Sequence, residues 1–482
     1  MVIRKGIRKE LPYDDGDLDS IIRYAAKLTG YSLKDVLGKE SGLVGGRNTK
    51  GYFGQLIESD YFFIENNSRP LPDFEKVGME LKVTPMKKTK GRLVSKERLV
   101  LGIIDYNDVP KRHFNTFTDK NSHILIIFYL WSSGTDLYDY KVLKVVDWKP
   151  SEEDLRIIKE DWDIIEGYIL RGEAHLLSER HTKFLAACTK GAGHGGDLRS
   201  QPFSKVMAKQ RALSFKPSYM TSLFHKSIDV NEMMLDVSNI PESEEGTIFI
   251  DEWEEGTSFE KYVLRRFDRF VGLSCERIEH ELGIVLDDSP KQYYNTLTLA
   301  MMGIFHKRYV REFEEADIQI KTIRLKKNGA SKESMSFPAF KYEELVEQTW
   351  DTSDFYEQID RKFFFPVFQF NTNDTSKESR KELTFKGAFF WSVPDNDFEI
   401  IEGVWNDTKE RILSEDFDHF IKASDGRISH IRPHGKNSKD TYPYKGKQYV
   451  KRCFWFNNNY IADVVKKNLF DSKTTLDDFD DP

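Results

Sequence analysis

Two carboxylates and a lysine lie near residue 80 in a pattern that could bind a metal ion. Asp73 is followed by Glu80 and then by Lys82. Residues 77–85 alternate apolar and charged side chains, which predicts a β-strand. Alternate side chains of a strand point to the same face, so we expect Glu80 and Lys82 to share one face while their neighbours enter the core.

This set of groups suits metal-assisted cleavage of a phosphodiester. The acids could hold a divalent cation, which polarises the phosphate and lowers the pKa of a bound water. The lysine could position that water or stabilise the charge that develops in the reaction. Alternating charges also occur on any half-exposed strand, so a solvated strand face is the alternative interpretation.

The strand with Glu80 needs a sheet and helices to hold it. Apolar runs predict further buried strands at 99–104, 124–129 and 140–147. Helices are predicted at 12–46, 50–65 and 152–170. The last begins with Ser151 and has acids in its first turn, a helix start signal. Mixed strands flanked by helices predict an α/β (α+β) domain with a mixed sheet.

Composition limits the class of protein. A chain of 482 residues is too long for one ordinary core, and 39% hydrophobic with 13% aromatic residues excludes general disorder. No apolar run approaches the roughly 20 residues of a membrane span. The charged N-terminus lacks a signal-peptide core, and Cys188, Cys275 and Cys453 have no metal-ligand spacing. We therefore expect a cytoplasmic protein with reduced thiols.

The net charge of −7 is unevenly divided between the two halves. Residues 1–230 contain 37 Lys and Arg against 31 Asp and Glu, whereas the remainder contains 35 against 48. The positive excess lies in the half that carries Glu80, and it clusters between residues 82 and 98. The cluster comprises Lys82, Lys87, Lys88, Lys90, Arg92, Lys96 and Arg98. A DNA duplex would meet such a surface through its phosphates; the alternative is a solvated turn.

The second half resembles a degraded copy of the first. Short echoes recur in the same order, among them 54–58 with 256–260, 79–82 with 318–321, 124–129 with 363–368, and the helix around Trp162 with one at 398–413. In the copied site Glu312 takes the place of Asp73, but Gln319 takes that of Glu80. A neutral amide is a poorer ligand for a hard dication than a carboxylate, so the copy should bind metal badly and cut poorly or not at all.

A polar, acidic stretch at 228–247 with Pro and Gly predicts the domain boundary. The expected organisation has four parts. They are a first domain at 1–230, a linker at 231–247, a second domain at 248–470 and an acidic tail at 471–482.

Residues 45–225 resemble the MutH mismatch-repair endonuclease and its relatives among restriction enzymes that cut at GATC. The resemblance is carried by the Lys50–Glu58 segment and by the Asp73, Glu80, Lys82 set. It implies the restriction-endonuclease-like fold, PD-(D/E)xK, present twice in tandem. It also implies that Asp73, Glu80 and Glu58 hold Mg²⁺, that Lys82 and Lys120 act in catalysis, and that Lys50 contacts DNA.

The resemblance extends to DNA-reading loops. Lys190, in the glycine-rich segment 187–195, matches a DNA-contacting lysine, and Tyr219 matches a tyrosine beside the adenine. Cys188 stands where MutH has an arginine that reads guanine, and cysteine cannot replace bidentate recognition worth about 1–3 kcal/mol. In the second half, the 430–436 segment resembles the family's recognition loop, which implies DNA contacts by Arg432 and Lys436.

These observations predict a type II restriction endonuclease that makes double-strand cuts at GATC. The first domain would cut, the second would bind another DNA site, and cutting both strands would require two chains, paired on DNA, or two successive events. A competing hypothesis is a MutH-type mismatch-repair nickase, although MutH has a single domain. Two further hypotheses are a non-catalytic methylation-sensing DNA-binding protein and a structural protein.

Overall fold

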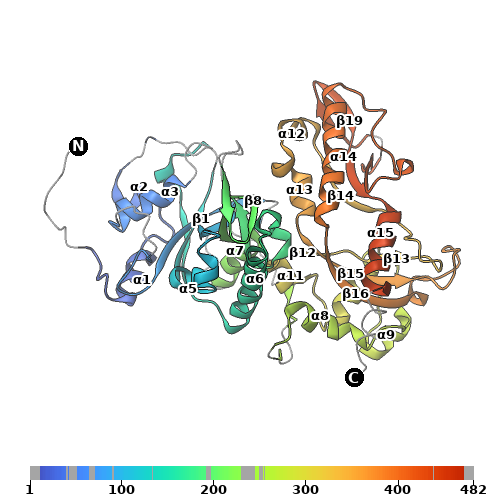
Figure 1. The fold of residues 1–482 in the computed structure, drawn as a ribbon, viewed down its shortest axis with the longest axis horizontal. Helices are drawn as coiled ribbons and strands as arrows, with labels where there is room; N and C mark the ends of the chain where they lie inside the picture. Colours follow the sequence, from blue (N-terminus) through green and yellow to red (C-terminus); the bar gives the residue numbers. More distant parts are fainter. Residues whose placement is uncertain are drawn as a thin grey trace. The chain divides into compact units, whose positions relative to one another are not determined.

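The computed structural model describes the chain except residues 1–10, 40–41, 43–50, 65–70, 90–91, 133, 191–196, 229–244, 249–252, 255, 438 and 472–482. It divides into two compact units (Figure 1). Unit 1 contains Met1–Ser243 and the short segment Glu314–Asp317. Unit 2 contains Glu244–Phe313 and Ile318–Pro482. The division after Ser243 falls within the segment predicted as a linker, which lies mostly outside the described residues, as does the predicted tail.

A mixed four-stranded sheet positions the residues around Glu80 in unit 1. Its strands, in spatial order, are β2 (Arg92–Ser95), β1 (Glu80–Thr89), β4 (Ile124–Leu130) and β5 (Val142–Trp148). Only β1 and β4 are parallel, with Glu80 beside Ile124, and the other pairs are antiparallel. All of β4 up to Tyr129 is buried, so the sheet is a rigid base for side chains at the start of β1.

Helices and a second sheet complete unit 1. The helices are α1 (Leu18–Ala26), α2 (Leu33–Leu37), α3 (Tyr52–Leu56), α4 (Val109–Arg112), α5 (Asn115–Asn121), α6 (Glu152–Leu170) and α7 (Pro217–Ser227). The second sheet has the order β3 (Leu99–Ile103), β9 (Arg211–Phe215), β6 (Leu185–Thr189), and β7 (Leu198–Gln201) forms a hairpin with β8 (Ser204–Lys209).

The prediction of one helix over 12–46 is wrong. The chain turns at Gly30, whose φ of 84° lies in the left-handed region that glycine tolerates. Ser32 then starts α2 with a capping box shared with Asp35. Two short helices therefore replace the single long one.

Unit 2 repeats this plan. One sheet has the order β12 (Ile318–Ile320), β15 (Lys362–Gln369), β13 (Ile323–Leu325), with β16 (Thr384–Ser392) also paired to β15. The other has the order β14 (Met335–Phe340), β20 (Arg452–Phe456), β17 (Ser429–Pro433), and β18 (Thr441–Tyr444) forms a hairpin with β19 (Lys447–Val450). Two short strands, β10 (Glu245–Gly246) and β11 (Tyr309–Val310), pair with each other.

The helices of unit 2 include close counterparts of those in unit 1. They are α8 (Phe259–Asp268), α9 (Cys275–Leu282), α10 (Tyr293–Met301), α11 (Arg311–Glu315), α12 (Tyr342–Glu347), α13 (Asp354–Ile359), α14 (Asp395–Leu413) and α15 (Asn458–Val465). Both α6 and α14 have 19 residues and follow the second strand of an antiparallel pair. The helix predicted at 398–413 corresponds to α14.

Strand register aligns the two copies residue by residue. Glu80 lies beside Ile124 in the parallel pair of unit 1, and Gln319 lies beside Phe363 in that of unit 2. Just before these strands, Gly78 and Asp317 both have positive φ, 66° and 54°. The tandem mixed α/β fold expected from the sequence is confirmed.

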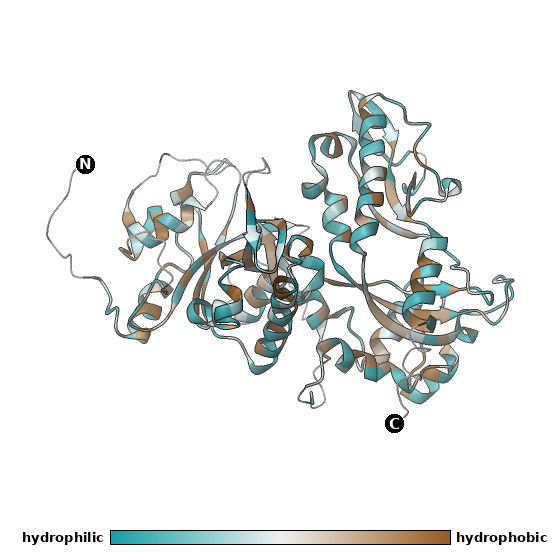
Figure 2. Ribbon diagram, in the orientation of Figure 1, coloured by the Kyte–Doolittle hydropathy of each residue, from teal (hydrophilic) through white to brown (hydrophobic). Residues whose placement is uncertain are grey.

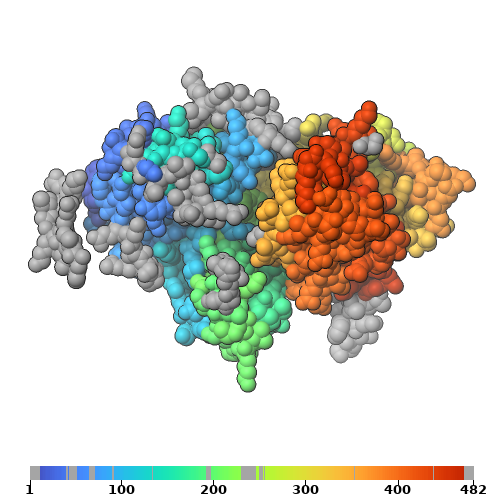
Figure 3. All heavy atoms as spheres, turned by 90° about the horizontal axis from the view of Figure 1, so that it is seen from above, coloured from blue at the N-terminus to red at the C-terminus, as the bar shows by residue number. Residues whose placement is uncertain are grey.

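Each unit is built around its own apolar core. Figure 2 shows hydrophobic residues concentrated on the central strands, while the long helices carry both hydrophobic and hydrophilic residues. In unit 2, β15 is buried from Lys362 to Phe368. The space-filling view shows closely packed side chains over the visible surface (Figure 3). Among the helices in the described part of the chain, none has the length and apolarity that a bilayer crossing requires.

Candidate active site

Glu80 is the centre of a charged cluster at the start of β1. Its side chain is only 1% exposed. The Oε1 atom accepts a hydrogen bond from Lys82 Nζ at 2.5 Å and lies 3.2 Å from Lys120 Nζ. Burial raises the pKa of Glu80, and the two lysines oppose that rise. The structure therefore brings together three of the residues that the sequence singled out.

Asp73 joins the cluster through the main chain. Its N–H donates to Glu80 Oε2 at 3.2 Å, and its Oδ2 accepts from the Leu81 N–H at 3.0 Å. These reciprocal bonds hold the loop before β1 against the strand, so the carboxylates of Asp73 and Glu80 are fixed close to each other.

Glu58 approaches from the helical segment before the sheet. The helix α3 continues into a single π-helical turn, Ile57–Tyr61, which places Glu58 in a local irregularity of the kind often found at functional sites. Burial and then the charge of Asp73 raise the pKa of Glu58, while Lys82 lowers it. Glu58 is thus within electrostatic range of the same cluster.

The donor set fits a divalent metal in chemical type. Three carboxylates offer hard oxygen ligands. Burial and then repulsion from Asp73 raise the pKa of Glu58, and a bound cation would relieve that repulsion. In the described residues, no three His, Cys, Asp or Glu side chains are already gathered as a metal site. Glu80 is instead neutralised by Lys82 and Lys120, so metal binding would require these contacts to rearrange.

The corresponding place in unit 2 has lost most of these groups. By strand register, Gln319 occupies the position of Glu80, and Ile359, which is fully buried, precedes β15 as Lys120 precedes β4. Lys321 is the counterpart of Lys82; its Nζ lies 3.4 Å from the carbonyl of Ser336, and burial lowers its pKa.

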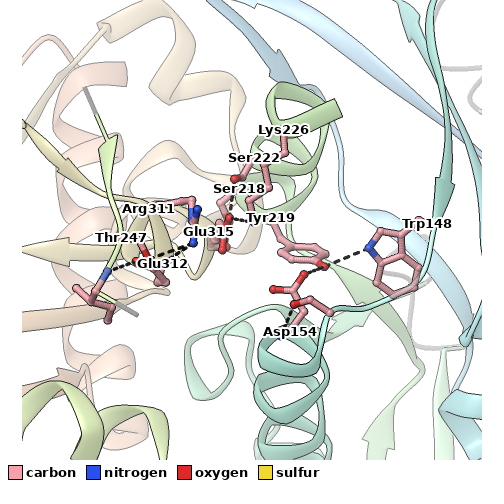
Figure 4. Close-up of polar contacts among 12 residues, drawn as sticks. Trp148, Asp154, Ser218, Tyr219, Ser222, Lys226, Thr247, Arg311, Glu312 and Glu315 are labelled. Carbon is pink, nitrogen blue, oxygen red and sulfur yellow. Dashed lines mark hydrogen bonds and ion pairs between the residues drawn. The ribbon is translucent and has the colours of Figure 1, made fainter. Parts of the chain in front are cut away.

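The remaining acids of unit 2 are committed to other partners. The carboxylate of Glu312, fully buried on α11, accepts from Thr247 Oγ1, the Ile248 N–H and Arg311 (Figure 4). Glu260, the counterpart of Glu58, forms an ion pair with Lys362. The described residues of the second copy therefore offer no open cluster of carboxylates at this place.

The residues predicted to contact DNA differ in where they lie. Lys50 and the loop 191–196 are outside the described residues. Lys190 is half-buried just after β6, and its N–H donates to the carbonyl of Gln210. Lys436 is exposed beyond β17, and its main-chain N–H donates to Asp440.

Strand register also allows a comparison of the two segments that resemble DNA-reading loops, 187–195 in unit 1 and 430–436 in unit 2. Cys188 in β6 lies opposite Ala212, whereas Arg432 in β17 lies opposite Cys453, at the equivalent place. Cys188 is 1% exposed, but Arg432 is exposed and lies 5.3 Å from the ring centre of Trp455. Strand register places Trp455 at the position that Ser214 has in unit 1. The sequence alone assigned no separate role to Trp455, and only its neighbour Arg432 indicated a DNA-contacting surface here.

Tyr219 occupies the core, which does not support direct contact with DNA. Its ring is 1% exposed, its hydroxyl donates to Asp154 at 2.8 Å, and it accepts from Trp148 Nε1 at 3.3 Å (Figure 4). In unit 2 the Tyr460 hydroxyl donates to Asp397 at the equivalent place. The recurrence of this pair in both copies indicates that Tyr219 joins α7 to α6 as a structural residue.

Some known proteins resemble this chain over its repeated domain, and one resembles it over nearly its whole length. The family model described as DNA mismatch repair enzyme MutH matches residues 62–161 and again 307–403. The type II restriction enzyme Sau3AI of Staphylococcus aureus is 32% identical, over 92% of this chain and 97% of its own. The DNA mismatch repair protein MutH of Shewanella woodyi is 28% identical over 45% of this chain and 96% of its own. MutH of Escherichia coli O139:H28 is 27% identical over 36% and 76%.

Proposed function

Because the chain belongs to the MutH-like type II restriction endonucleases, we propose that this site-specific endonuclease makes double-strand cuts at GATC. The specificity is supported by the reading-loop residues, above all Arg432 in its Ile-Arg-Pro context. An arginine can read guanine through two hydrogen bonds in the major groove. Such an enzyme acts on DNA in the cytoplasm.

The convergence of five side chains in unit 1 carries the assignment of the cutting site. Glu58, Asp73 and Glu80 would hold Mg²⁺, which supplies a polarised phosphate and an acidified water when bound. Lys82, beside Glu80, orients or deprotonates the attacking water. Lys120 approaches the same carboxylate and stabilises the charge that develops on the phosphate oxygens.

Unit 2 acts as a second DNA-binding module in this proposal. Its equivalents of Glu80 and Lys120 are Gln319 and Ile359, so it lacks the groups for cleavage. Instead, the exposed Arg432 lies over the ring of the half-buried Trp455, and Lys436 is exposed beyond β17. With one cutting site per chain, cleavage of both strands uses two chains paired on DNA or two successive events.

Plasmid cleavage tests this function. We expect linear product from a plasmid with one GATC site in Mg²⁺, binding without cleavage in Ca²⁺, and no cleavage of a matched plasmid from which the site is removed. End sequencing would locate the cuts. An end product that is nicked but never linear would instead support a mismatch-repair type of nickase, and cleavage of the site-free plasmid would refute the GATC specificity.

A further inference from the structure

The hairpin of β7 and β8 in unit 1 has an exposed, cationic side (Figure 1). Lys205, Met207 and Lys209 alternate along β8, so they point to the same side of the hairpin. Both lysines are exposed, Met207 between them is 46% exposed, and Leu198 opposite Lys209 is 44% exposed. In the part of the chain that the structure describes, neither lysine forms an ion pair.

The hairpin is fixed to the body of unit 1. Gln201 is only 5% exposed; its Oε1 accepts from the Ala174 N–H and its Nε2 donates to the Val206 carbonyl, both at 2.7 Å. The Tyr106 hydroxyl donates to the carbonyl of Lys209 at 2.6 Å. The two lysines are therefore carried on a backbone that is held in place.

The base of the hairpin adjoins the segment 187–195, which resembles a DNA-reading loop. The Lys190 N–H donates to the carbonyl of Gln210 at 2.8 Å, and the Gln210 N–H donates to the carbonyl of Asp197 at 2.6 Å. Lys190 precedes β7 and Gln210 follows β8, so these bonds join the chain before the hairpin to the chain after it. A duplex read by that segment would lie close to the hairpin.

The turn of the hairpin holds an aromatic residue in a strained conformation. Phe203 has a φ of 62° and is 73% exposed. A bulky side chain rarely adopts the left-handed region, and such strain is found mainly where a residue contacts a ligand. The turn of the β18–β19 hairpin in unit 2 has Gly446 at the equivalent position, with a φ of 76°.

The lysines of the hairpin in unit 2 are neutralised. Lys445 and Lys447 each lie 3.3 Å from a carboxylate oxygen of Glu415, and Lys451 pairs with Asp440 at 2.5 Å. A hairpin at this place of the fold therefore does not require lysines without acidic partners, and the free cations are particular to unit 1.

Free cations on a fixed arm beside a DNA-reading segment favour a polyanion as the partner. Four residues of strand separate Lys205 from Lys209 by about 13 Å. Phosphates of one DNA strand repeat every 3.4 Å or about that along the helix axis, so a single strand can meet both lysines. We propose that this hairpin contacts the DNA backbone beside the recognised sequence, with both lysines on phosphates and Phe203 against the sugars.

This contact rests on the proposed nuclease function and adds a sequence-independent grip by unit 1 to it. Salt-dependent binding of a GATC duplex by the full chain in Ca²⁺ tests it. The double variant Lys205→Gln, Lys209→Gln should bind at least ten-fold more weakly. Its plot of log affinity against log salt concentration should be shallower by about 1.8, because each phosphate contact contributes about 0.9 to the slope.

The matched control is Lys27→Gln with Lys34→Gln, which removes two exposed lysines at the end of α1 and in α2. It should keep the wild-type slope. If the wild type cleaves a GATC plasmid but the hairpin variant keeps its affinity and its slope, the hairpin contact alone is refuted. A wild type that neither binds nor cleaves GATC DNA would refute the proposed function on which the contact rests.

Phe203→Gly separates the aromatic contact from the ionic ones. Glycine tolerates the positive φ, so urea unfolding should find this variant at least as stable as the wild type. We expect its DNA affinity to fall at least three-fold with an unchanged salt slope. An affinity equal to that of the wild type, or a loss that appears only together with a loss of stability, would exclude Phe203 from the contact.

Discussion

In the proposed cutting site, one buried oxygen of Glu80 is shared between Lys82 and Lys120. Replacing Glu80 by Gln introduces the residue that unit 2 has at this place. We expect Glu80→Gln to reduce cleavage on the order of 10³-fold or more, because an amide is a poor ligand for a hard dication. Single-turnover cleavage in Mg²⁺ measures this loss.

The control for this variant is Asp119→Asn, on the exposed side of the helix that carries Lys120. It should cut within about two-fold of the wild type, because it removes a surface charge without touching the cluster. Both variants should bind a GATC duplex in Ca²⁺ with similar affinity. If Glu80→Gln cleaves at the normal rate, Glu80 does not belong to the cutting site.

The raised pKa values of Glu58 and Glu80 predict pH-dependent metal binding. A carboxyl with a raised folded-state pKa retains its proton to higher pH, so metal must displace protons and binds more weakly as the pH falls towards that pKa. The same raised pKa values affect folding without metal. Their contribution to the free energy of unfolding is fully present below the pKa that these carboxyls have in the unfolded chain, and it is lost as the pH rises through their pKa in the folded protein.

Calorimetry of Mg²⁺ binding in buffers of different ionisation enthalpy measures the proton release. We expect more protons to be released at the lower pH than at the higher one, because the raised pKa values keep the carboxyls protonated as the pH falls. Glu58→Gln should release fewer protons at the lower pH and bind Mg²⁺ more weakly. An enthalpy independent of buffer at both pH values would contradict the raised pKa values.

At this scale the sequence predicted the site unevenly. Glu80 and Lys82 could be singled out because strand alternation fixes which side chains share a face, and Asp73 because of its spacing from them. Glu58 and Lys120 are distant in sequence and were found only through a family resemblance. Trp455 was missed because its partner strand, and hence its position beside Arg432, exists only in the folded sheet.

At the scale of elements, the contact between α6 and α7 through Tyr219 leads to a stability prediction. Tyr219→Phe leaves Asp154 and Trp148 without their shared partner, so we expect a loss of about 1–3 kcal/mol in the free energy of unfolding. Urea unfolding measures the loss. DNA affinity in Ca²⁺ should stay within about two-fold, and a large loss of affinity with unchanged stability would restore the direct DNA contact.

The equivalent change in unit 2 is the matched comparison. Tyr460→Phe removes a hydroxyl that donates to Asp397, so it should also destabilise the protein. A destabilisation in only one unit would contradict the equivalence of the two pairs.

Elements with strong periodicity were predictable, and those set by backbone detail were not. The helix α6 begins at Glu152 after Ser151, whose side chain accepts from the Asp154 N–H, as the capping signal indicated. Leu155, an apolar residue of this helix, is 40% exposed. The packing of Glu314–Asp317 with unit 1 had no sequence signal, because it depends on tertiary contacts of a single buried carboxylate.

At the scale of the whole molecule, a repeated fold carries different residues at equivalent places, Glu80 in unit 1 and Gln319 in unit 2. The tandem plan could be inferred from the common order of weak echoes, whereas the residue-level equivalence required strand register.

We expect Arg432→Ala to weaken binding to a GATC duplex by about 1–3 kcal/mol without changing metal binding. Fluorescence anisotropy in Ca²⁺ measures the affinity.

Lys436 provides the control for that variant. Lys436→Ala should weaken binding to a GATC duplex and to a scrambled duplex by similar factors. It should also reduce the salt dependence of the affinity, because a lysine that contacts phosphate does not distinguish between sequences. If Arg432→Ala binds both duplexes like the wild type, unit 2 does not read DNA through this loop.

The central claim is that unit 1 cuts and unit 2 does not. It is tested most directly by the matched variants Lys82→Met and Lys321→Met, which remove the same residue type from equivalent places in the two units. In single-turnover cleavage of a GATC plasmid in Mg²⁺, Lys82→Met should give no linear product, while Lys321→Met should cut at close to the wild-type rate. Retained cutting by Lys82→Met together with loss of cutting by Lys321→Met would contradict the claim.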